Sequence, residues 1–426
     1  MRSSRQPHTN ETVVRRHRPM YQIALFMGLL LLLGLVVMYA LGPQRANVMN
    51  SALGTDYGDT YFFNKQLFSV AISVVAFAVA AAVPYRLLTE EWERRLLLAG
   101  LAACFLLVIC GAVLHLPFAD DTNGAYRWFY FGPIGFQPAE LLKFGVLIFM
   151  AGFLARRLRQ GKINDVQETL IPAGIILAVS MFVVVVLQKD LGTGISLVAI
   201  ILSALVVSGM SWRIIGRIIG GLAVAALILT FSSPHRVERV MTFIQGDTHQ
   251  SQSDDNYHIQ QARIAIGSGG LLGLGIGKSV QATGYLPEAI NDSIFAIMGE
   301  TFGFVGLIII LALFTALLLS LLRVASRLAD VRLRLIVAGV FGWVTSQVVM
   351  NIASMTGVLP MTGISLPLLS YGGTNMLFIA AALGLAFQLS GYTSHKALVE
   401  GEGDGKDPSG RRRFRRTRLV DRKSVV

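Results

Sequence analysis

The chain has 426 residues, of which 54% are hydrophobic and only 15% are charged, and its formal net charge is +12. A soluble globular domain carries roughly 25% charged residues, so this composition excludes an ordinary soluble protein. The charges are absent from long apolar runs and are concentrated between them. That distribution is typical of a polytopic membrane protein.

Ten apolar runs are long enough to cross about 30 Å of hydrocarbon at about 1.5 Å per residue. They predict an all-α polytopic membrane protein with ten transmembrane helices. The expected spans lie near residues 21–42, 67–84, 96–117, 139–155, 170–187, 191–210, 214–231, 294–319, 336–356 and 375–391.

The distribution of Lys and Arg predicts the orientation, because cytoplasmic loops retain positive charge. Both tails and one set of alternate loops carry 28 of the 37 cations, whereas the opposite loops carry 8. Both termini are therefore expected in the cytoplasm. This gives a basic N-tail at residues 1–20, a membrane domain at 21–391 and a basic C-tail at 392–426, which we expect to be disordered.

The C-tail contains the basic string RRRFRRTR, Arg411–Arg418. It could bind anionic lipid headgroups or nucleic acid. The preceding stretch EGEGDGKDPSG has the composition of a flexible linker. We therefore favour lipid binding or simple topological anchoring, and expect no nucleic acid partner.

One outer loop, residues 232–293 between the seventh and eighth spans, is much longer than the others. Loops of this length are usually functional or disordered. Within it, GLLGLGIGKS (Gly270–Ser279) resembles a phosphate-binding loop, but Leu272 stands where that motif needs its first glycine. The favoured interpretation is a glycine-rich loop whose backbone approaches membrane or ligand closely.

Glu140, Lys143 and Glu300 lie inside predicted spans. Glu140 and Lys143 are three residues apart, so they share a helix face and can pair. Intramembrane ions are expensive and often mark function, although a purely structural bridge is a serious alternative. Glu300 lies in GETFG, a small-xxx-small helix contact, and we favour a packing role for it over a proton path.

Further polar residues gather at the outer ends of the spans. Arg127 and Trp128 lie between the third and fourth spans, Asp190 lies between the fifth and sixth, and Glu288 and Asp292 precede the eighth. These carboxylates are candidates for chemistry at the membrane surface.

The last outer loop, residues 357–375, has no charge but is rich in proline and glycine. Irregular backbone at membrane depth must line a cavity or be buried in protein. Gln347 and Asn351, at i and i+4 on the ninth span, are predicted to point at this loop. Interhelical hydrogen bonding is the simpler role for both.

Four strings together resemble the SEDS family (shape, elongation, division and sporulation), typified by FtsW and RodA. They are YRWFYFGPIGFQPAELLK from Tyr126, QKDLGT from Gln188, the segment Tyr257–Glu300, and NIASMTGVLPMTGISLPLLSYGG from Asn351. In order, they cover nearly the whole membrane portion. The YLPEA and IAIGSGG strings resemble the division branch, FtsW, slightly more than the elongation branch.

The chain departs from the family pattern in several places. Ala139 and Lys189 replace the usual serine and proline, and Thr301 replaces a second glutamate. The usual H-T-D-F before the eighth helix is altered at every position except the aspartate, Asp292. A histidine directly beside that aspartate in sequence is therefore not expected to have a role.

The resemblance implies a peptidoglycan glycosyltransferase that polymerises lipid II, an undecaprenyl-pyrophosphate-linked disaccharide, at the outer face of the membrane. It places the catalytic aspartate at Asp292, as general base. The other expected substrate-binding residues are Arg127, Trp128, Glu140, Lys143, Asp190, Arg263, Lys278, Glu288, Ser370 and Tyr371. A divalent metal, Mg²⁺ or Mn²⁺, could help to neutralise the pyrophosphate, but no His or Cys cluster specifies a metal site.

The resemblance also implies a class B penicillin-binding protein transpeptidase as partner, with divisome subunits if the chain belongs to the division branch. The expected location is the bacterial cytoplasmic membrane at the septum. Three alternatives stay open at this stage: an elongation polymerase like RodA, a lipid II flippase or transporter, and a scaffold that recruits wall enzymes. Intramembrane charges and broken helices would also suit a transporter.

Overall fold

The computed structural model describes residues 18–121, 125–132, 134–231, 237 and 254–392. The expectations for most of the N-tail, for the polar start of the long loop and for the C-tail with its basic string lie outside the described residues. The α-helices, in chain order, are α1 (Tyr21–Leu53), α2 (Tyr61–Ala82), α3 (Glu90–Val108), α4 (Pro138–Arg159), α5 (Ile171–Met181), α6 (Leu191–Val207), α7 (Trp212–Phe231), α9 (Asp254–Ser268), α10 (Ile294–Arg327), α11 (Val331–Met355) and α12 (Gly373–Ser390).

Short helical pieces and strands connect or extend these helices. A π-helical turn, Ile109–Val113, continues α3, and two more, Val166–Leu170 and Phe182–Leu187, flank α5; 3₁₀ turns cover Tyr85–Leu87 and Gln281–Thr283. Three strands, β1 (Ala119–Asp121), β2 (Tyr126–Phe131) and β3 (Ile134–Phe136), form an antiparallel sheet in that order. Phe129 in β2 pairs with Ala119 on one side and with Phe136 on the other.

The helical prediction is confirmed, and each of the ten expected spans contains a helix. Eight helices in the described part of the chain are long and apolar enough to cross a membrane. Of the other two, α6 has 17 residues and α7 has 20. The prediction missed the small sheet and helix α9, which both lie in connections that we expected to be loops.

Helix α1 is longer than its apolar run. It continues for eleven residues past the expected boundary at residue 42, through Pro43, and ends where Gly54 adopts a left-handed conformation with φ 65°. The Gly54 N–H donates to Asn50 O, which satisfies an otherwise unpaired carbonyl at the helix end. The helix therefore stops at a glycine C-cap rather than at the end of its apolar sequence.

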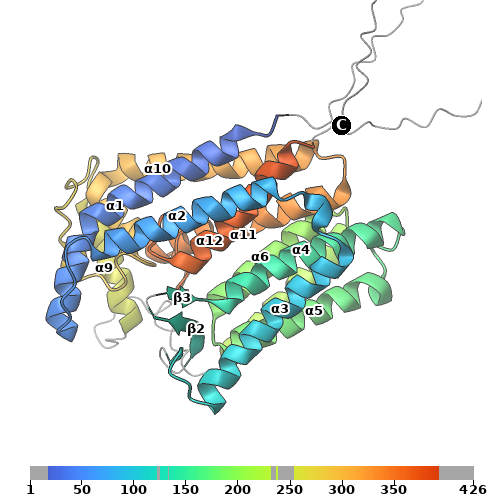
Figure 1. The fold of residues 1–426 in the computed structure, drawn as a ribbon, viewed down its shortest axis with the longest axis horizontal. Coiled ribbons are helices and arrows are strands. Elements are labelled where there is room, and N and C mark those ends of the chain that lie inside the picture. The colour runs from blue at the N-terminus through green and yellow to red at the C-terminus, as the bar shows by residue number, and fades with distance from the viewer. Residues whose placement is uncertain (1–17, 122–124, 133, 232–236, 238–253, 393–426) are drawn as a thin grey trace, which may run out of the picture. The chain divides into compact units, whose positions relative to one another are not determined.

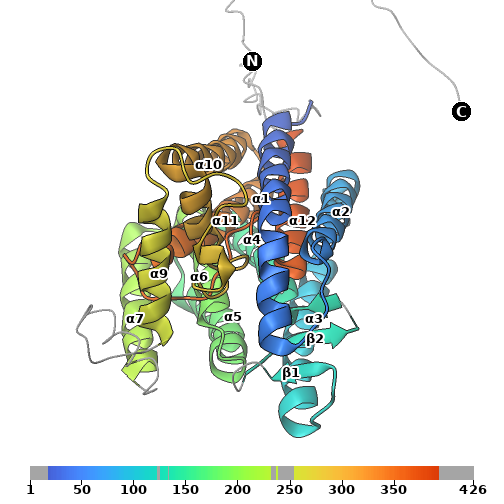
Figure 2. The ribbon, with the colours of Figure 1, turned by 90° about the vertical axis from the view of Figure 1, so that its left-hand side faces the viewer.

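Helices α4, α11 and α12 occupy the centre of the bundle (Figures 1 and 2). In the most apolar window of α4, 83% of the residues are buried, against 11% in α2, which lies at the periphery. Close helix contacts depend on glycine: a Cβ at Gly100 of α3 would lie 2.6 Å from Leu142 Cα of α4, and one at Gly384 of α12 would lie 2.4 Å from Phe77 O of α2. Small residues at helix interfaces are the usual means of close packing in membranes.

The two ends of the bundle can be told apart from contacts between distant residues. Met20 N donates to Ser390 Oγ at 2.7 Å, and Arg323 Nη1 donates to Gln22 Oε1 at 3.2 Å. The start of α1 and the ends of α10 and α12 thus lie together, and we call this the terminal end. Helix α10 begins at the opposite end, directly after Asp292, and we call that the site end.

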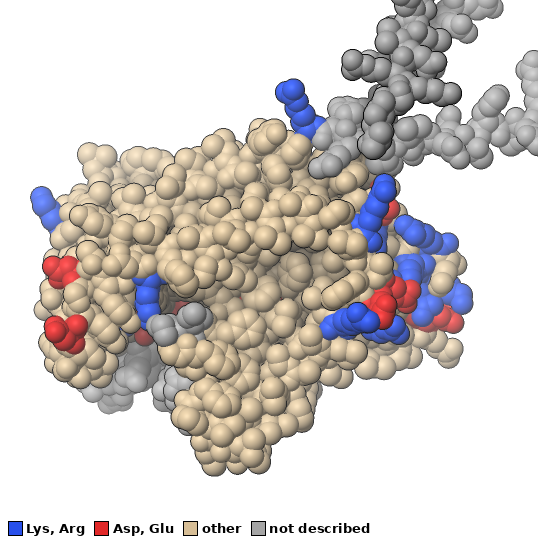
Figure 3. Space-filling view, viewed as in Figure 1, with Lys and Arg blue, Asp and Glu red and all other residues tan. Residues whose placement is uncertain are grey.

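An ionic cluster centred on a buried carboxylate joins three helices at the terminal end. The Glu93 side chain of α3 is fully buried and lies 2.7 Å from Arg156 Nη1 of α4 and 2.6 Å from Arg332 Nη2 of α11. Figure 3 shows many charged side chains gathered at this end, and a broad uncharged band separates them from those at the other end. Such a band is what a hydrocarbon core requires of the protein surface.

Candidate active site

Asp292 lies in the turn that leads into α10 at the site end, with its side chain partly exposed. Partial burial raises the pKa of this carboxyl to about 7, and the negative charges of Glu288 and Asp190 act in the same direction, while Arg127 opposes them. Four of the predicted site residues, from three separate segments, are therefore near enough to influence one another. A carboxyl group with a pKa near neutrality is suited to general base catalysis.

Helix α11 and the last outer loop hold the backbone around Asp292. Asn351 Nδ2 of α11 donates to both Asp292 O and Ile364 O, each at 2.7 Å. Tyr371 N donates to Ile290 O at 2.8 Å. A Cβ added at Gly363 would lie 3.6 Å from Asp292 Oδ2, so this loop also approaches the carboxylate itself. The prediction that Asn351 points at the last loop is confirmed.

Asp190 caps helix α6. Its carboxylate accepts hydrogen bonds from Thr193 N at 2.9 Å, from Thr193 Oγ1 at 2.8 Å and from Gln137 Nε2 at 3.1 Å. An aspartate at an N-cap accepts hydrogen bonds from free backbone N–H groups, and its negative charge interacts favourably with the positive end of the helix dipole. Asp190 thereby ties the start of α6 to the start of α4.

Arg127 binds the turn that precedes this cap. From β2, its Nε donates to Gln188 O at 3.1 Å and its Nη2 donates to Lys189 O at 2.8 Å. Lys189 has φ 52°, a conformation that is uncommon for a residue with a side chain. Because a guanidinium group has five N–H donors, these two bonds leave Arg127 with donors for a ligand.

The expected pair of Glu140 and Lys143 is confirmed, and it is almost completely buried. The two side chains are 3% and 1% exposed, and Lys143 Nζ lies 2.7 Å from Glu140 Oε1. Lys143 Nζ also lies 5.0 Å from the centre of the Trp343 ring. The Gln347 amide lies 3.2 Å from Lys143 Nζ and 3.3 Å from Trp343 Nε1, so its oxygen faces both donors. The pair is thus built into the contact between α4 and α11.

Glu300 fastens the glycine-rich loop to α10. Its buried carboxylate accepts hydrogen bonds from the Ser279 hydroxyl, from Val280 N at 2.9 Å and from Gln281 N at 3.3 Å. These bonds support the favoured packing role, with a loop rather than a second helix as the partner. Lys278, next to this anchor, is exposed, and Arg263 on α9 is exposed and donates to Gly357 O at 3.2 Å.

The remaining predicted residues lie at the site end with protein partners. Ser370 is buried, and its Oγ accepts from Leu366 N at 2.8 Å. The Tyr371 ring packs edge-on against Phe62, with centroids 5.7 Å apart, and burial raises the pKa of its hydroxyl. Trp128 stacks on Tyr130 in β2, and the exposed Glu288 accepts a hydrogen bond from the Asn291 amide.

Sequence reasoning missed one polar contact beside the aspartate. His258 Nε2 of α9 lies 2.5 Å from Ser293 Oγ, and the Ser293 hydroxyl donates to Pro287 O at 2.8 Å. Because a hydroxyl has one proton to donate, His258 Nε2 is the donor to Ser293. A histidine from a distant helix therefore reaches the residue next to Asp292, although none stands beside Asp292 in the sequence. The YH dipeptide at the start of the third family-like string was the only available signal.

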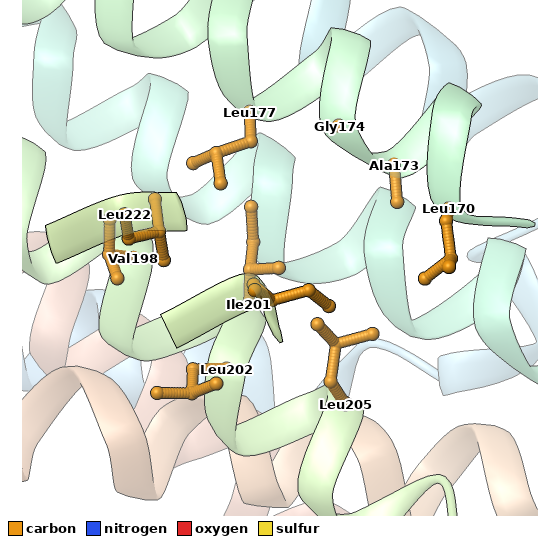
Figure 4. A pocket seen from close by; sticks show the side chains of 10 residues that line it. Leu170, Ala173, Gly174, Leu177, Val198, Ile201, Leu202, Leu205 and Leu222 are labelled. Carbon is orange, nitrogen blue, oxygen red and sulfur yellow. The ribbon is translucent and has the colours of Figure 1, made fainter. Parts of the chain in front are cut away.

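A metal site or an apolar pocket would be another feature that could bind a ligand. Within the described residues, no group of three or more His, Cys, Asp or Glu side chains is placed to hold a metal ion. An apolar pocket of about 80 Å³ lies between α5, α6 and α7 (Figure 4). Its lining has no polar side chain, so it has no group that could bind a pyrophosphate. The lining residues are Leu170, Ala173, Gly174, Leu177, Val198, Ile201, Leu202, Leu205, Ile218 and Leu222.

The site is thus a partly buried acid near the cation Arg127 and the Asp190-capped start of α6, at one end of a polytopic bundle. The family model for FtsW, RodA and SpoVE, described as cell cycle protein, matches residues 20–395. The chain belongs to this family, and it is a multi-pass membrane protein.

Relatives with different names match to similar degrees. The stage V sporulation protein E of Bacillus subtilis is 32% identical over 86% of this chain and 95% of its own length. A probable peptidoglycan glycosyltransferase FtsW of Halorhodospira halophila is 33% identical over 87% and 90%, and the peptidoglycan glycosyltransferase MrdB of Escherichia coli is 33% identical over 85% and 94%.

Solved structures share the fold. A chain in a peptidoglycan synthase complex, studied for the coordination of polymerization and crosslinking, matches with TM-score 0.66 and 25% identity over 87% of this chain and 97% of that one. The rod shape determining protein RodA of Thermus thermophilus matches with TM-score 0.62 and 25% identity over 87% and 96%.

Proposed function

We propose that this protein is a peptidoglycan glycosyltransferase that polymerises lipid II, with Asp292 as the general base. Family membership and the names of the relatives support the reaction class. The observation that carries the role of Asp292 is its partly buried carboxyl with a pKa of about 7, beside the cation Arg127 at the site end. The charge distribution of the loops supports an orientation in which the site end faces outward.

The reaction requires one acid–base group from the protein. The 4-hydroxyl of one lipid-linked disaccharide attacks the anomeric carbon at the reducing end of the growing glycan. The new C–O bond forms as the bond from that carbon to the pyrophosphate oxygen breaks, and the proton of the hydroxyl passes to Asp292. Undecaprenyl pyrophosphate leaves as an anion, so it needs cations rather than a general acid, and Arg127 retains donors for that task.

The test is Asp292→Asn in purified protein reconstituted with its partner. We expect glycan polymerisation from lipid II to be lost while the melting temperature does not fall. Asp56→Asn, which alters an exposed carboxylate in the connection between α1 and α2, is the matched control and should retain full activity. Polymer formation by Asp292→Asn at the rate of the control would overturn the assignment.

The rival functions predict different results in the same vesicles. A flippase would move labelled lipid II across the bilayer without forming polymer, and a pure scaffold would support growth even as Asp292→Asn. The fully buried Glu93, paired with Arg156 and Arg332, argues against an open passage at the terminal end. Polymerisation is therefore the function that we adopt.

For the partner and the cellular role, we propose a class B penicillin-binding protein and the division branch. The likeness to a chain of a peptidoglycan synthase complex supports the partner, and the YLPEA and IAIGSGG strings favour division, with divisome subunits as further partners at the septum. Depletion should then give filaments. Rounded cells would assign the chain to elongation instead.

If the reaction uses Mg²⁺ or Mn²⁺, the oxygens of the substrate pyrophosphate would hold the ion, since Mg²⁺ is commonly bound through substrate phosphates and no group of three or more His, Cys, Asp or Glu side chains in the described residues is placed to hold one. The ion would supply charge neutralisation at the leaving group. Addition of EDTA to the polymerisation assay, followed by Mg²⁺, tests this: activity that survives EDTA unchanged excludes the ion.

A further inference from the structure

Residues 270–278, which we call the glycine-rich segment, expose an unusual amount of apolar surface for a loop. Leu271 and Leu272 are 71% and 81% exposed, and Leu274 and Ile276 are 39% and 57% exposed. Contiguous exposed apolar side chains mark a surface that contacts a partner or a membrane. The exposed Lys278 ends the segment.

Helix α10 holds this segment by backbone hydrogen bonds. At Gly303, with φ 67° and ψ −168°, the helix is broken. The peptide groups around the break pair with the segment: Leu274 N donates to Glu300 O at 2.9 Å, and Phe304 N donates to Gly270 O at 2.9 Å. A Cβ at Gly273 would lie 2.2 Å from Thr301 O, so only glycine permits this approach. The segment and the break in α10 therefore lie at the same depth.

The sequence of α10 sets that depth. Phe304 follows the break and Arg323 is exposed at the terminal end, and nineteen residues at 1.5 Å each separate them by about 28 Å. This nearly equals the thickness of the hydrocarbon core, about 30 Å. With Arg323 at one membrane surface, the break at Gly303 lies at the other. The apolar surface of the segment is continuous with the exposed face of α10, where Phe304 and Val305 are 58% and 45% exposed.

We propose that the glycine-rich segment is a lipid-binding element, whose four aliphatic side chains enter the acyl chains of the outer leaflet while Lys278 lies among the lipid phosphates. Burial of aliphatic side chains in hydrocarbon is favourable, and lysine at a membrane interface extends its charge to the headgroups. A soluble partner protein is a less suitable occupant, because the segment lies at membrane depth beside a lipid-facing helix. Because Glu300 joins the residues that follow the segment to α10, and α10 begins just after Asp292, this contact also sets the height of Asp292 above the bilayer.

Nitroxide labels read out the depth of each side chain directly in lipid nanodiscs. The two native cysteines, Cys104 and Cys110, are buried and are first replaced by Cys104→Ala and Cys110→Ala. Single cysteines are then introduced by Leu272→Cys and Ile276→Cys in the segment, by Lys278→Cys at its end, by Ile309→Cys as the lipid-facing control in α10 and by Asp56→Cys as the water-facing control.

At positions 272 and 276 we expect collisions with oxygen to exceed those with an aqueous nickel chelate several-fold, as at position 309. Position 278 should give an intermediate ratio, and position 56 should favour the chelate. Ratios at 272 and 276 equal to that at 56 would overturn the proposal, and strong immobilisation at both positions with access to neither reagent would instead indicate a protein partner. Either segment label suffices if the other variant fails to fold. Because no step of this experiment measures polymerisation, its result does not depend on whether the proposed function is correct.

Discussion

Replacing Lys143 by methionine removes the cation from a fully buried ion pair and leaves the Glu140 carboxylate alone between α4 and α11. The pair is 1% and 3% exposed with a nitrogen–oxygen distance of 2.7 Å, so water cannot replace the lost partner. Breaking such a pair from one side costs about 3–5 kcal/mol. The Gln347 oxygen loses one of its two donors as well, which adds to the loss.

The double variant Lys143→Met with Glu140→Gln separates this effect from simple loss of packing. It leaves no buried charge, so we expect it to recover about 2–4 kcal/mol of the stability lost in the single variant. The assay is unfolding of the purified protein in detergent, by heat and by sodium dodecyl sulfate titration. Lys278→Met, at an exposed lysine, is the control and should leave the transition unchanged. If the single and double variants unfold together, the isolated buried carboxylate is not the cause.

Three further predictions concern Asp292, Glu300 and Gly152. Polymerisation should rise with pH and reach half its maximum near pH 7, because Asp292 acts as a base only when deprotonated. Since the pKa of Asp292 in the folded protein lies above the unfolded value of about 3.9, folding stability should fall as pH rises from about 4 to 7. Asp292→Asn should therefore melt at a higher temperature than wild type at pH 8 but not at pH 4. A flat pH–rate profile would contradict its role. Glu300→Gln should accelerate amide hydrogen exchange at Val280 and Gln281, which lose their carboxylate acceptor; unchanged protection would show that the anchor is unimportant. Gly152→Ala should lower stability by about 1–3 kcal/mol, because its Cβ would lie 2.0 Å from Glu93 Oε1, whereas Gly174→Ala, with open space around it, should not; equal melting temperatures would refute this steric argument.

The helical architecture followed from local sequence, because a polypeptide in hydrocarbon must satisfy its backbone hydrogen bonds within each segment. Each apolar run therefore became a helix, and the pairing of Glu140 with Lys143 followed from their spacing of three residues. The small sheet and helix α9 escaped prediction because neither has an apolar run long enough to cross a membrane, and helix α1 extends past its run to Gly54.

The environment of the candidate base could not be predicted in this way. Asp292 acquires its raised pKa from burial, from the nearby Glu288 and from Asp190, which is 102 residues earlier in the chain. Its backbone is held by Asn351, and its neighbour Ser293 by His258, and both contacts depend on how helices pack at the site end. Periodicity and motif spacing give no information on such contacts between distant segments.

The sequence by itself determined that this is a membrane protein built from apolar helices. Its motifs resemble those of the family closely enough to single out one aspartate as the candidate base. These properties depend on composition and on short-range spacing. Only the tertiary structure decided that Trp343 and Gln347 surround Lys143, that Glu300 anchors a loop, and that the glycine-rich segment lies beside the break in α10. Those facts arise from packing between segments far apart in the chain, and packing is set by the shapes of all the helices together.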